Sequence, residues 1–278
     1  MSDDTATEPS WLAQTSGRVV DATRTLGEQT AFYGNALVST VDAVQRYPAE
    51  VLRLIAEMGL GTGALAVIGG AVVIIGFLTL STGALIAVQG YNTLSNVGIG
   101  ALTGFLEAFL NVRFIAPATA GVALAATIGA GATAQLGAMR INEEIDALEV
   151  MGIRAVTYLV ATRVVAGVLV VIPLYTVAVL MSFLATRFGT TVIYGQSRGV
   201  YDHYFSTFLQ PTDLVWSFVA ALSMAAAVMV VHTYYGFNAT GGPAGVGEAV
   251  GRAVRTSVTA TVFVLLPSTR RWRSVESS

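Results

Sequence analysis

The side chains best able to do chemistry in the middle of this chain lie in one short segment, "QLGAMRINEEIDALEVMGI", residues 135–153. The stretches on both sides are apolar and carry almost no charge. The segment itself holds one arginine and four carboxylates within ten positions: Arg140, Glu143, Glu144, Asp146 and Glu149. Arg140 and Glu144 are four residues apart, the spacing at which opposite charges pair on a helix. The pattern predicts either a charged face that binds a partner or an ordinary loop helix with a solvated face.

Catalytic, metal and redox sites find little support elsewhere in the sequence. Cysteine is absent, and the two histidines, His203 and His232, are isolated from each other, which argues against disulfides and metal clusters. All fifteen cationic residues are arginine, so the lysine of a Walker A loop is missing and ATP hydrolysis is expected on a separate subunit. No basic arm indicates nucleic acid. We therefore expect no enzyme, no metal and no cofactor in this chain.

The composition indicates a polytopic helical membrane protein. Of 278 residues, 54% are hydrophobic and 12% are charged, whereas soluble domains carry about 25% charged residues. Mean hydropathy is +0.67. Several apolar stretches reach the roughly 20 residues that a helix needs to cross a bilayer. The predicted fold is all-α with about five transmembrane helices, at 60–88, 115–136, 157–185, 212–235 and 256–267.

Three regions are expected along the chain: 1–56, 57–267 and 268–278. The first alternates apolar and polar residues at helical spacing and is too polar to span, so it predicts an amphipathic helix or helix pair in the membrane interface. A soluble hairpin on the cytoplasmic face is the alternative. The second is the transmembrane domain, and the third is a tail. No cleaved signal peptide is expected, because no short apolar stretch with a cleavage site follows the polar start.

Two parts of the transmembrane domain are less regular. The low-charge stretch 99–136 is too long for one untilted helix and slightly too short for two spans with a loop. Pro117 and two charged residues interrupt its first half, which predicts a re-entrant or broken helix over 99–113. The last apolar stretch reaches only about 16 Å as a helix, roughly half of the hydrocarbon core. A short or partly inserted last helix and a poorly ordered tail are therefore expected.

Arginine counts predict that the charged segment is cytoplasmic. If the N-terminus is inside and 99–136 crosses once, nine arginines face the cytoplasm and two face outward, as the positive-inside rule favours. The nine are Arg18, Arg24, Arg46, Arg53, Arg140, Arg154, Arg163, Arg252 and Arg255, and the two are Arg187 and Arg198. As a helix, 139–152 would place Ile141, Ile145, Leu148 and Met151 on one stripe and its acids on the opposite face.

Two further sets of residues have patterns suited to the membrane. Small residues recur every fourth position, which lets helix backbones approach closely, either at an interface with a second subunit or within the chain: Gly121, Ala125, Gly129, Thr133 and Gly137. Glu107 and Arg113 are ionisable groups at or near membrane depth, where charge is costly unless it is paired or hydrated. They could have a structural role at the broken helix, line a transport path or lie at the membrane–water interface. Their spacing of six residues argues against a bridge within the helix.

Residues 134–152 closely resemble the signature of the MlaE/YrbE permeases, the membrane subunits of Mce-associated lipid ABC transporters. The resemblance continues through "VQGY" (88–91), the arginine of "TRVVAG" (162–167) and "GFNATGGPAGVGEAVGRAVRTS" (236–257). It implies that 139–152 is a cytoplasmic coupling helix whose five charged residues dock on the ATPase. It also implies Mce substrate-binding proteins, a second permease, a lipid substrate and a cytoplasmic (inner) membrane location.

The chain departs from the family pattern at a few positions. Arg113 is followed by Phe114 where many members have glutamate, and Gln135 stands where the phospholipid transporters often have glutamate. These departures resemble the actinobacterial YrbE branch, with a B-type paralogue as the expected subgroup. A secondary transporter of a hydrophobic substrate is the rival function. It often shows internal repeats and needs intramembrane ionisable sites; no repeat is visible, and only Glu107 and Arg113 qualify.

Overall fold

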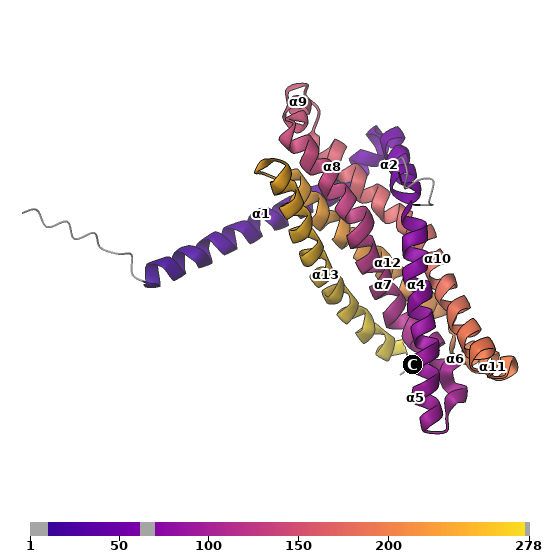
Figure 1. Ribbon diagram of the computed structural model, residues 1–278. Helices are drawn as coiled ribbons and strands as arrows, with labels where there is room; N and C mark the ends of the chain where they lie inside the picture. The colour runs from indigo at the N-terminus through magenta and orange to yellow at the C-terminus, as the bar shows by residue number, and fades with distance from the viewer. Residues whose placement is uncertain (1–10, 62–69, 276–278) are drawn as a thin grey trace, which may run out of the picture.

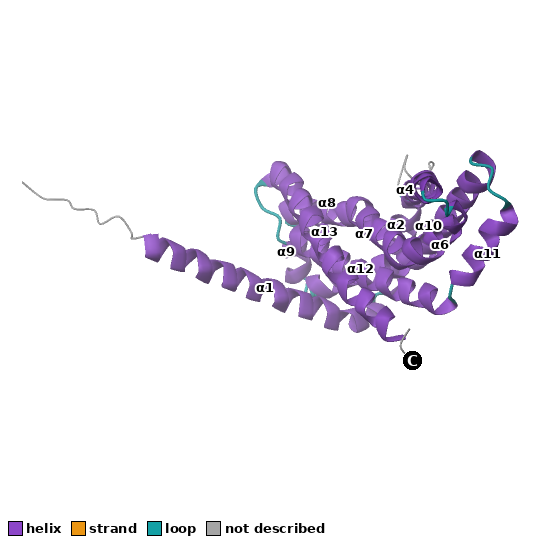
Figure 2. Ribbon diagram, turned by 90° about the horizontal axis from the view of Figure 1, so that it is seen from below, coloured by secondary structure: helices purple, strands orange, loops and turns teal. Residues whose placement is uncertain are grey.

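The computed structural model describes residues 11–61 and 70–275, and all of its regular secondary structure in these ranges is helical. The expected all-α class is confirmed (Figure 2). Five helical segments are long and apolar enough to cross a membrane, as predicted. They are Ala71–Asn96, Gly100–Ile141, Val156–Ile193, Pro211–Phe237 and Gly242–Leu266.

Two helices precede the spans, α1 (Trp11–Arg46) and α2 (Pro48–Leu60). Pro48 lies in the first turn of α2, where its missing N–H costs no helical hydrogen bond, and it prevents α1 from continuing. The N-terminal part of α1 extends away from the bundle in both views (Figures 1 and 2). Its C-terminal part packs on the bundle, with Ala36 and Ala43 fully buried. The opening region is therefore a helix pair; its position along a membrane surface stays a prediction.

The first span is built from α4 (Gly70–Leu85), the π-helix η1 (Ile86–Gly90) and α5 (Tyr91–Asn96). The sequence suggests a turn at "VQGYN", but the helix runs on through Gly90 and Tyr91, and the turn follows Asn96. Tyr91 stacks on Tyr194 of the third span, with 4.6 Å between ring centroids. This contact holds together the ends of two helices.

The second span corrects the expected broken helix. Residues 100–141 form one continuous helical segment of 42 residues, about 60 Å long at 1.5 Å per residue. Wide π-helical turns absorb Pro117 without a break, as π adjustments do in membrane helices. The segments are η2 (Gly100–Leu102), α6 (Thr103–Leu106), η3 (Glu107–Ile115), α7 (Ala116–Leu124), η4 (Ala125–Gly129) and α8 (Ala130–Ile141). Since the hydrocarbon core is about 30 Å thick, one end of this helix must protrude.

The third and fourth spans form the centre of the bundle. The third consists of η5 (Val156–Ala161), α10 (Thr162–Phe188) and η6 (Gly189–Ile193), and the fourth is α12 (Pro211–Phe237). The short helix α11 (Arg198–Phe208) lies between them. α10 packs against α4, α2 and α12, and α12 packs against α8 and α13. Their shared core includes Leu174, Val228 and Met229, all buried.

The last helix is much longer than expected. α13 runs from Gly242 to Val275, and its span of 25 residues covers about 37 Å. The expectation of a short, partly inserted helix is wrong, because the glycine-rich residues 242–255, which precede the last apolar stretch, are helical as well. Glu248 and Arg252 pair at i,i+4 in this part, 3.4 Å apart, and a helix tolerates such spaced charges. The C-terminal end of α13 lies at the end of the bundle opposite the short helix α9 (Glu144–Val150) (Figure 1).

Candidate functional site

The charged segment forms a bent element at one end of the bundle (Figure 1). The predicted single helix 139–152 is divided: α8 ends at Ile141, and α9 begins at Glu144. Glu143 joins them with φ 60°, the single non-glycine residue with positive φ in the described part of the chain. A left-handed residue reverses the helical path within one position. We call residues 140–151 the acidic elbow.

The bend changes which charges of the acidic elbow pair. The expected partner of Arg140 was Glu144, but the structure places Arg140 Nη1 2.6 Å from Asp146 Oδ1. The i,i+4 rule fails because the two residues no longer share one helix. Both side chains are well exposed, so the pair contributes less than about 1 kcal/mol. It joins the last turn of α8 to the first turn of α9 across the bend.

The acidic elbow is anchored by an apolar underside. Ile145 is fully buried, and Leu148 packs with it against Leu136 and Leu159. Met151 was expected on the same stripe but is 66% exposed, and Met139 packs in the cluster instead. Val150 is 88% exposed, and the four carboxylates all face solvent. The elbow therefore presents acids and two bare apolar side chains on a rigidly held turn.

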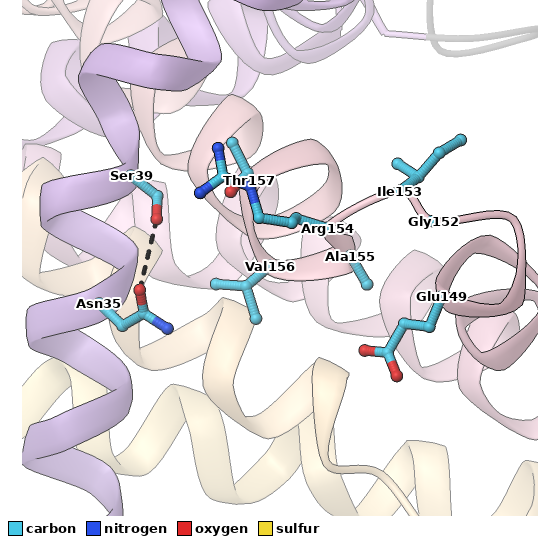
Figure 3. Close-up of a pocket in the computed structure, with 9 residues that line it drawn as sticks. All are labelled: Asn35, Ser39, Glu149, Gly152, Ile153, Arg154, Ala155, Val156 and Thr157. Carbon is cyan, nitrogen blue, oxygen red and sulfur yellow. Dashed lines mark hydrogen bonds between the residues drawn. The ribbon is translucent and has the colours of Figure 1, made fainter.

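A cleft of ≈ 400 Å³ lies between α1 and the chain that leaves α9 (Figure 3). Asn35 and Ser39 line it from α1, and Glu149 and residues 152–157 line it from the other side. Nearby, Arg154 Nη2 lies 2.7 Å from Asp42 Oδ2. Sequence patterns gave no signal for this ion pair. It fastens the opening helix directly to the segment that follows the acidic elbow.

Arg113 finds its partner on another span. Its Nη2 lies 3.0 Å from Oδ2 of Asp213, and both side chains are almost fully buried. The guanidinium carbon also lies 4.1 Å from the centroid of the Phe109 ring, a favourable cation–π distance. Sequence analysis missed Asp213, which stands in the first turn of α12 behind Pro211. A negative charge is favoured at that position of a helix.

Glu107 does not pair with Arg113. It is fully buried, and its carboxyl group is surrounded by uncharged polar side chains. Asn111 Nδ2 lies 2.7 Å from Oε1, Thr186 Oγ1 lies 2.7 Å from Oε2, and Ser182 Oγ lies 3.3 Å from Oε1. Asn111 is on the same span, whereas Ser182 and Thr186 are on α10. The two buried charges therefore belong to separate groups of side chains.

The stripe of small residues packs within the chain. All five positions are buried. A Cβ at Gly121 would meet Thr261 and Met224, and a Cβ at Gly129 would meet the His232 ring. The structure thus uses the stripe for close contact with α12 and α13, which corrects its assignment to an interface with a second permease. A second subunit would have to meet another face.

The contacts of His232 were not predicted, because this histidine is isolated in the sequence. It is fully buried, with Nδ1 2.7 Å from Thr133 Oγ1 and Nε2 3.1 Å from Ser257 Oγ. The ring therefore links α8, α12 and α13. Its short contacts explain why position 129 is glycine. With no third ligand among the described residues, the arrangement does not suit a metal.

Comparison with known proteins shows that most of the chain matches one protein family. The family described as Permease MlaE matches residues 61–268, which include the acidic elbow and both buried charge groups. A "Probable ABC transporter permease protein" of Rickettsia bellii is 25% identical over 202 residues, covering 69% of this chain and 73% of that protein. A probable ABC transporter permease of Synechocystis is 27% identical over 152 residues, covering 55% of this chain and 57% of that protein.

A plant relative matches as well. "Protein TRIGALACTOSYLDIACYLGLYCEROL 1, chloroplastic" of Arabidopsis thaliana is 26% identical over 176 residues. The match covers 63% of this chain and half of the plant protein's length.

Proposed function

Because the chain belongs to the MlaE permease family, we propose that it is the membrane-spanning subunit of an ABC-type lipid transporter. Relatives from Rickettsia carry the name of ABC transporter permeases. The Arabidopsis relative carries the name of a galactolipid, which supports a lipid as the substrate class. Five apolar spans provide the membrane domain that such a subunit needs.

The observation that carries this proposal is the acidic elbow at one end of the bundle. Its acids and two exposed apolar residues, Val150 and Met151, are held outward by the buried Ile145. ABC transporters divide the work between permease and ATPase, and this chain has no lysine for a Walker A loop. The elbow is therefore the surface on which a separate ATPase docks, through Arg140, Glu143, Glu144, Asp146 and Glu149.

The path from the acidic elbow into the membrane is direct. α8 is the last part of a continuous helical segment that begins at Gly100. On the other side of the elbow, α1 packs against η5, and the exposed pair of Arg154 with Asp42 adds to this contact. A displacement of the elbow by nucleotide-dependent closure of the ATPase would therefore move the second span and α1 together. Rigid-body movement of packed helices is a common way to transmit such a change.

The finer assignments are part of the same proposal. The partners are Mce-family substrate-binding proteins, two ATPase subunits and a second, paralogous permease, in a cytoplasmic (inner) membrane. Phe114 and Gln135, which differ from the phospholipid branch, favour the actinobacterial YrbE branch and its B-type members. The second permease meets a face other than the small-residue stripe, because that stripe is buried in this chain.

Co-purification with charge-reversal variants tests the docking assignment. In Glu143→Lys/Glu149→Lys, neither acid belongs to an ion pair among the described residues, so the elbow should keep its shape. The variant should insert normally, lose the ATPase subunit on purification and lose lipid transport. The control Asp202→Lys/Glu248→Lys makes the same change in net charge at exposed acids outside the elbow. Full ATPase recovery and normal transport in the elbow variant would contradict the proposal. Lipid transport by the wild type without any ATPase subunit would contradict it as well and would favour a secondary transporter.

A further inference from the structure

The carboxyl group of Glu107 lies where the first three spans meet. Thr186 Oγ1 is 2.7 Å from Glu107 Oε2 and also 2.8 Å from the carbonyl oxygen of Gly83 in α4. Gly83 itself is in backbone contact with α10, since a Cβ there would collide with the Ser182 backbone. The hydroxyl of Thr186 therefore connects the carboxyl group to a close backbone approach of α4 and α10.

The hydrogens available to this group decide its protonation state. The Gly83 carbonyl can only accept a hydrogen bond, and a threonine hydroxyl has a single proton to donate. If Thr186 donates to Gly83, its contact with Glu107 requires a proton on Oε2 of the glutamate. If Glu107 were ionised, two acceptors would compete for one proton, and one 2.7–2.8 Å contact would join two lone pairs. A neutral carboxylic acid satisfies the whole chain, from Oε2–H through Thr186 to the Gly83 carbonyl.

The surroundings of Glu107 offer no charge that would favour ionisation. Among the residues that the structure describes, no arginine lies within ion-pair distance of its carboxyl group, and Arg113 is paired with Asp213. The second span contributes Asn111, and α10 contributes Ser182 and Thr186, all uncharged. From α11 the titratable group facing Glu107 is Tyr201, and beyond it Asp202 is paired with Arg187. An ionised carboxylate without a partner at membrane depth is costly.

We propose that Glu107 is a proton-binding site of the permease, and that its bound proton fastens α4 to α10 through Thr186 and Gly83. The proton is the ligand, held on Oε2 and shared with the Thr186 hydroxyl. Loss of the proton would leave two acceptors facing one hydroxyl at this close helix contact, and the two helices would separate there. This inference does not depend on which substrate or ATPase the permease serves.

Unpartnered buried oxygens lie on the α11 side of this site. The Asn111 Oδ1 atom, the Thr190 hydroxyl and the Tyr201 hydroxyl are buried without a hydrogen-bond partner. Asn111 and Tyr201 are each about 1% exposed. Burial raises the pKa of the Tyr201 hydroxyl, so it stays protonated and able to donate. Such groups are normally paired with protein or ordered water.

The geometry of the hydrogen bonds around Glu107 favours a proton over a metal ion as the ligand. Cations such as sodium or calcium are held by several oxygen atoms pointing inward. Here the Asn111 amide nitrogen lies 2.7 Å from Glu107 Oε1 and 2.7 Å from Ser182 Oγ, the orientation that gives the nitrogen two acceptors. A nitrogen that donates to the carboxyl oxygen is incompatible with an ion in the same place.

Infrared spectroscopy of the full-length chain in lipid nanodiscs tests the proposal at neutral pH. A protonated glutamic acid has a carbonyl stretch that an ionised carboxylate lacks. We expect this band in the wild type and its loss in Glu107→Gln. The control Glu248→Gln, at an exposed acid of α13, should leave the band unchanged. A band of equal intensity in Glu107→Gln, or none in the wild type, would overturn the proposal.

A second variant, Thr186→Val, tests the proposal even if Glu107→Gln folds poorly. Thr186→Val retains the carboxyl group and removes its hydrogen-bond acceptor, so the carbonyl band should persist at a shifted frequency. An unshifted band would show that the proton is not directed at Thr186. Spectra recorded after exchange between sodium, potassium and choline buffers should be identical. A band that appears only when alkali cations are removed would assign the site to a cation and contradict proton binding.

Discussion

Arg113 and Asp213 form an ion pair between the second and fourth spans, with Nη2 3.0 Å from Oδ2 and both side chains less than 10% exposed. Asp213 neutralises the charge of Arg113, for which the sequence alone suggested no partner. Arg113 is therefore paired apart from Glu107, whose carboxyl group is surrounded by uncharged polar side chains.

Replacing Asp213 by alanine should be strongly destabilising. The change leaves the Arg113 guanidinium buried without its carboxylate, and breaking a buried pair in this way costs about 3–5 kcal/mol. The comparison is Asp202→Ala, which removes a carboxylate from the exposed pair with Arg187 and should cost less than about 1 kcal/mol. Denaturant unfolding in mixed micelles measures both. Equal losses for the two variants would show that the buried pair does not stabilise the bundle.

Replacing Glu143 by glycine should stabilise the acidic elbow. Glu143 has φ 60°, a conformation that costs a side-chain residue about 1 kcal/mol and costs glycine nothing. The control Ala147→Gly lies in the middle of α9 and should instead destabilise it by roughly 0.5–1 kcal/mol. Hydrogen exchange of the α9 amides reports the local free energy of opening. Faster exchange in Glu143→Gly would mean that the bend differs from the one described.

Adding one methyl group at Gly129 should disturb the bundle, whereas adding it at Gly131 should not. A Cβ at Gly129 would lie 2.6–2.9 Å from the His232 ring, but a Cβ at Gly131 meets nothing within 4 Å. Overpacking of this kind costs about 1–3 kcal/mol, while alanine in an open helical position is favourable. Thermal unfolding of the purified chain, without a second permease, separates packing in the chain from an interface role. A normal midpoint for Gly129→Ala would return the stripe to the interface interpretation.

Acid should weaken the helix α2, because the pair of Glu50 with Arg53 lies within this helix. The hydrogen bond from Arg53 holds the pKa of Glu50 below its ordinary value. Because the pKa in the folded state is the lower one, the stabilisation is complete above the unfolded pKa and is lost as pH falls through the folded value. Proteolysis or hydrogen exchange of α2 between neutral and acidic pH should show this loss. The variant Glu50→Gln should lack this dependence, and an identical acid response in both would exclude Glu50 as its source.

The sequence was sufficient for the spans but not for their irregularities. Hydropathy locates helices well because a bilayer requires long apolar segments with internally satisfied backbones. It does not register π-helical turns, so Pro117 suggested a break that the helix avoids. Glycine and proline in 242–255 likewise suggested a connector, although the helical ion pair of Glu248 with Arg252 was present in the sequence.

The site was predicted in composition but not in geometry. The cluster of charge in the acidic elbow was plain, and its carboxylates are exposed as expected. Its bend was not predictable, because glutamate is an unusual choice for a left-handed residue. Asp213 and His232 were missed for another reason. Each contacts a residue about 100 positions away, and a single sequence contains no signal for such pairs.

The absence of cysteine from the chain allows a direct measurement of the central claim, that the acidic elbow docks on an ATPase. Val150→Cys places one thiol at the 88% exposed tip of the elbow, and Val97→Cys places one at a 69% exposed position in the turn after α5, at the opposite end of the bundle (Figure 1). Each variant would be treated with a short thiol-to-amine crosslinker in native membranes. The account predicts a crosslink from position 150 to a Walker-motif subunit and none from position 97. No such crosslink from position 150, with transport and labelling of the thiol both intact, would contradict it.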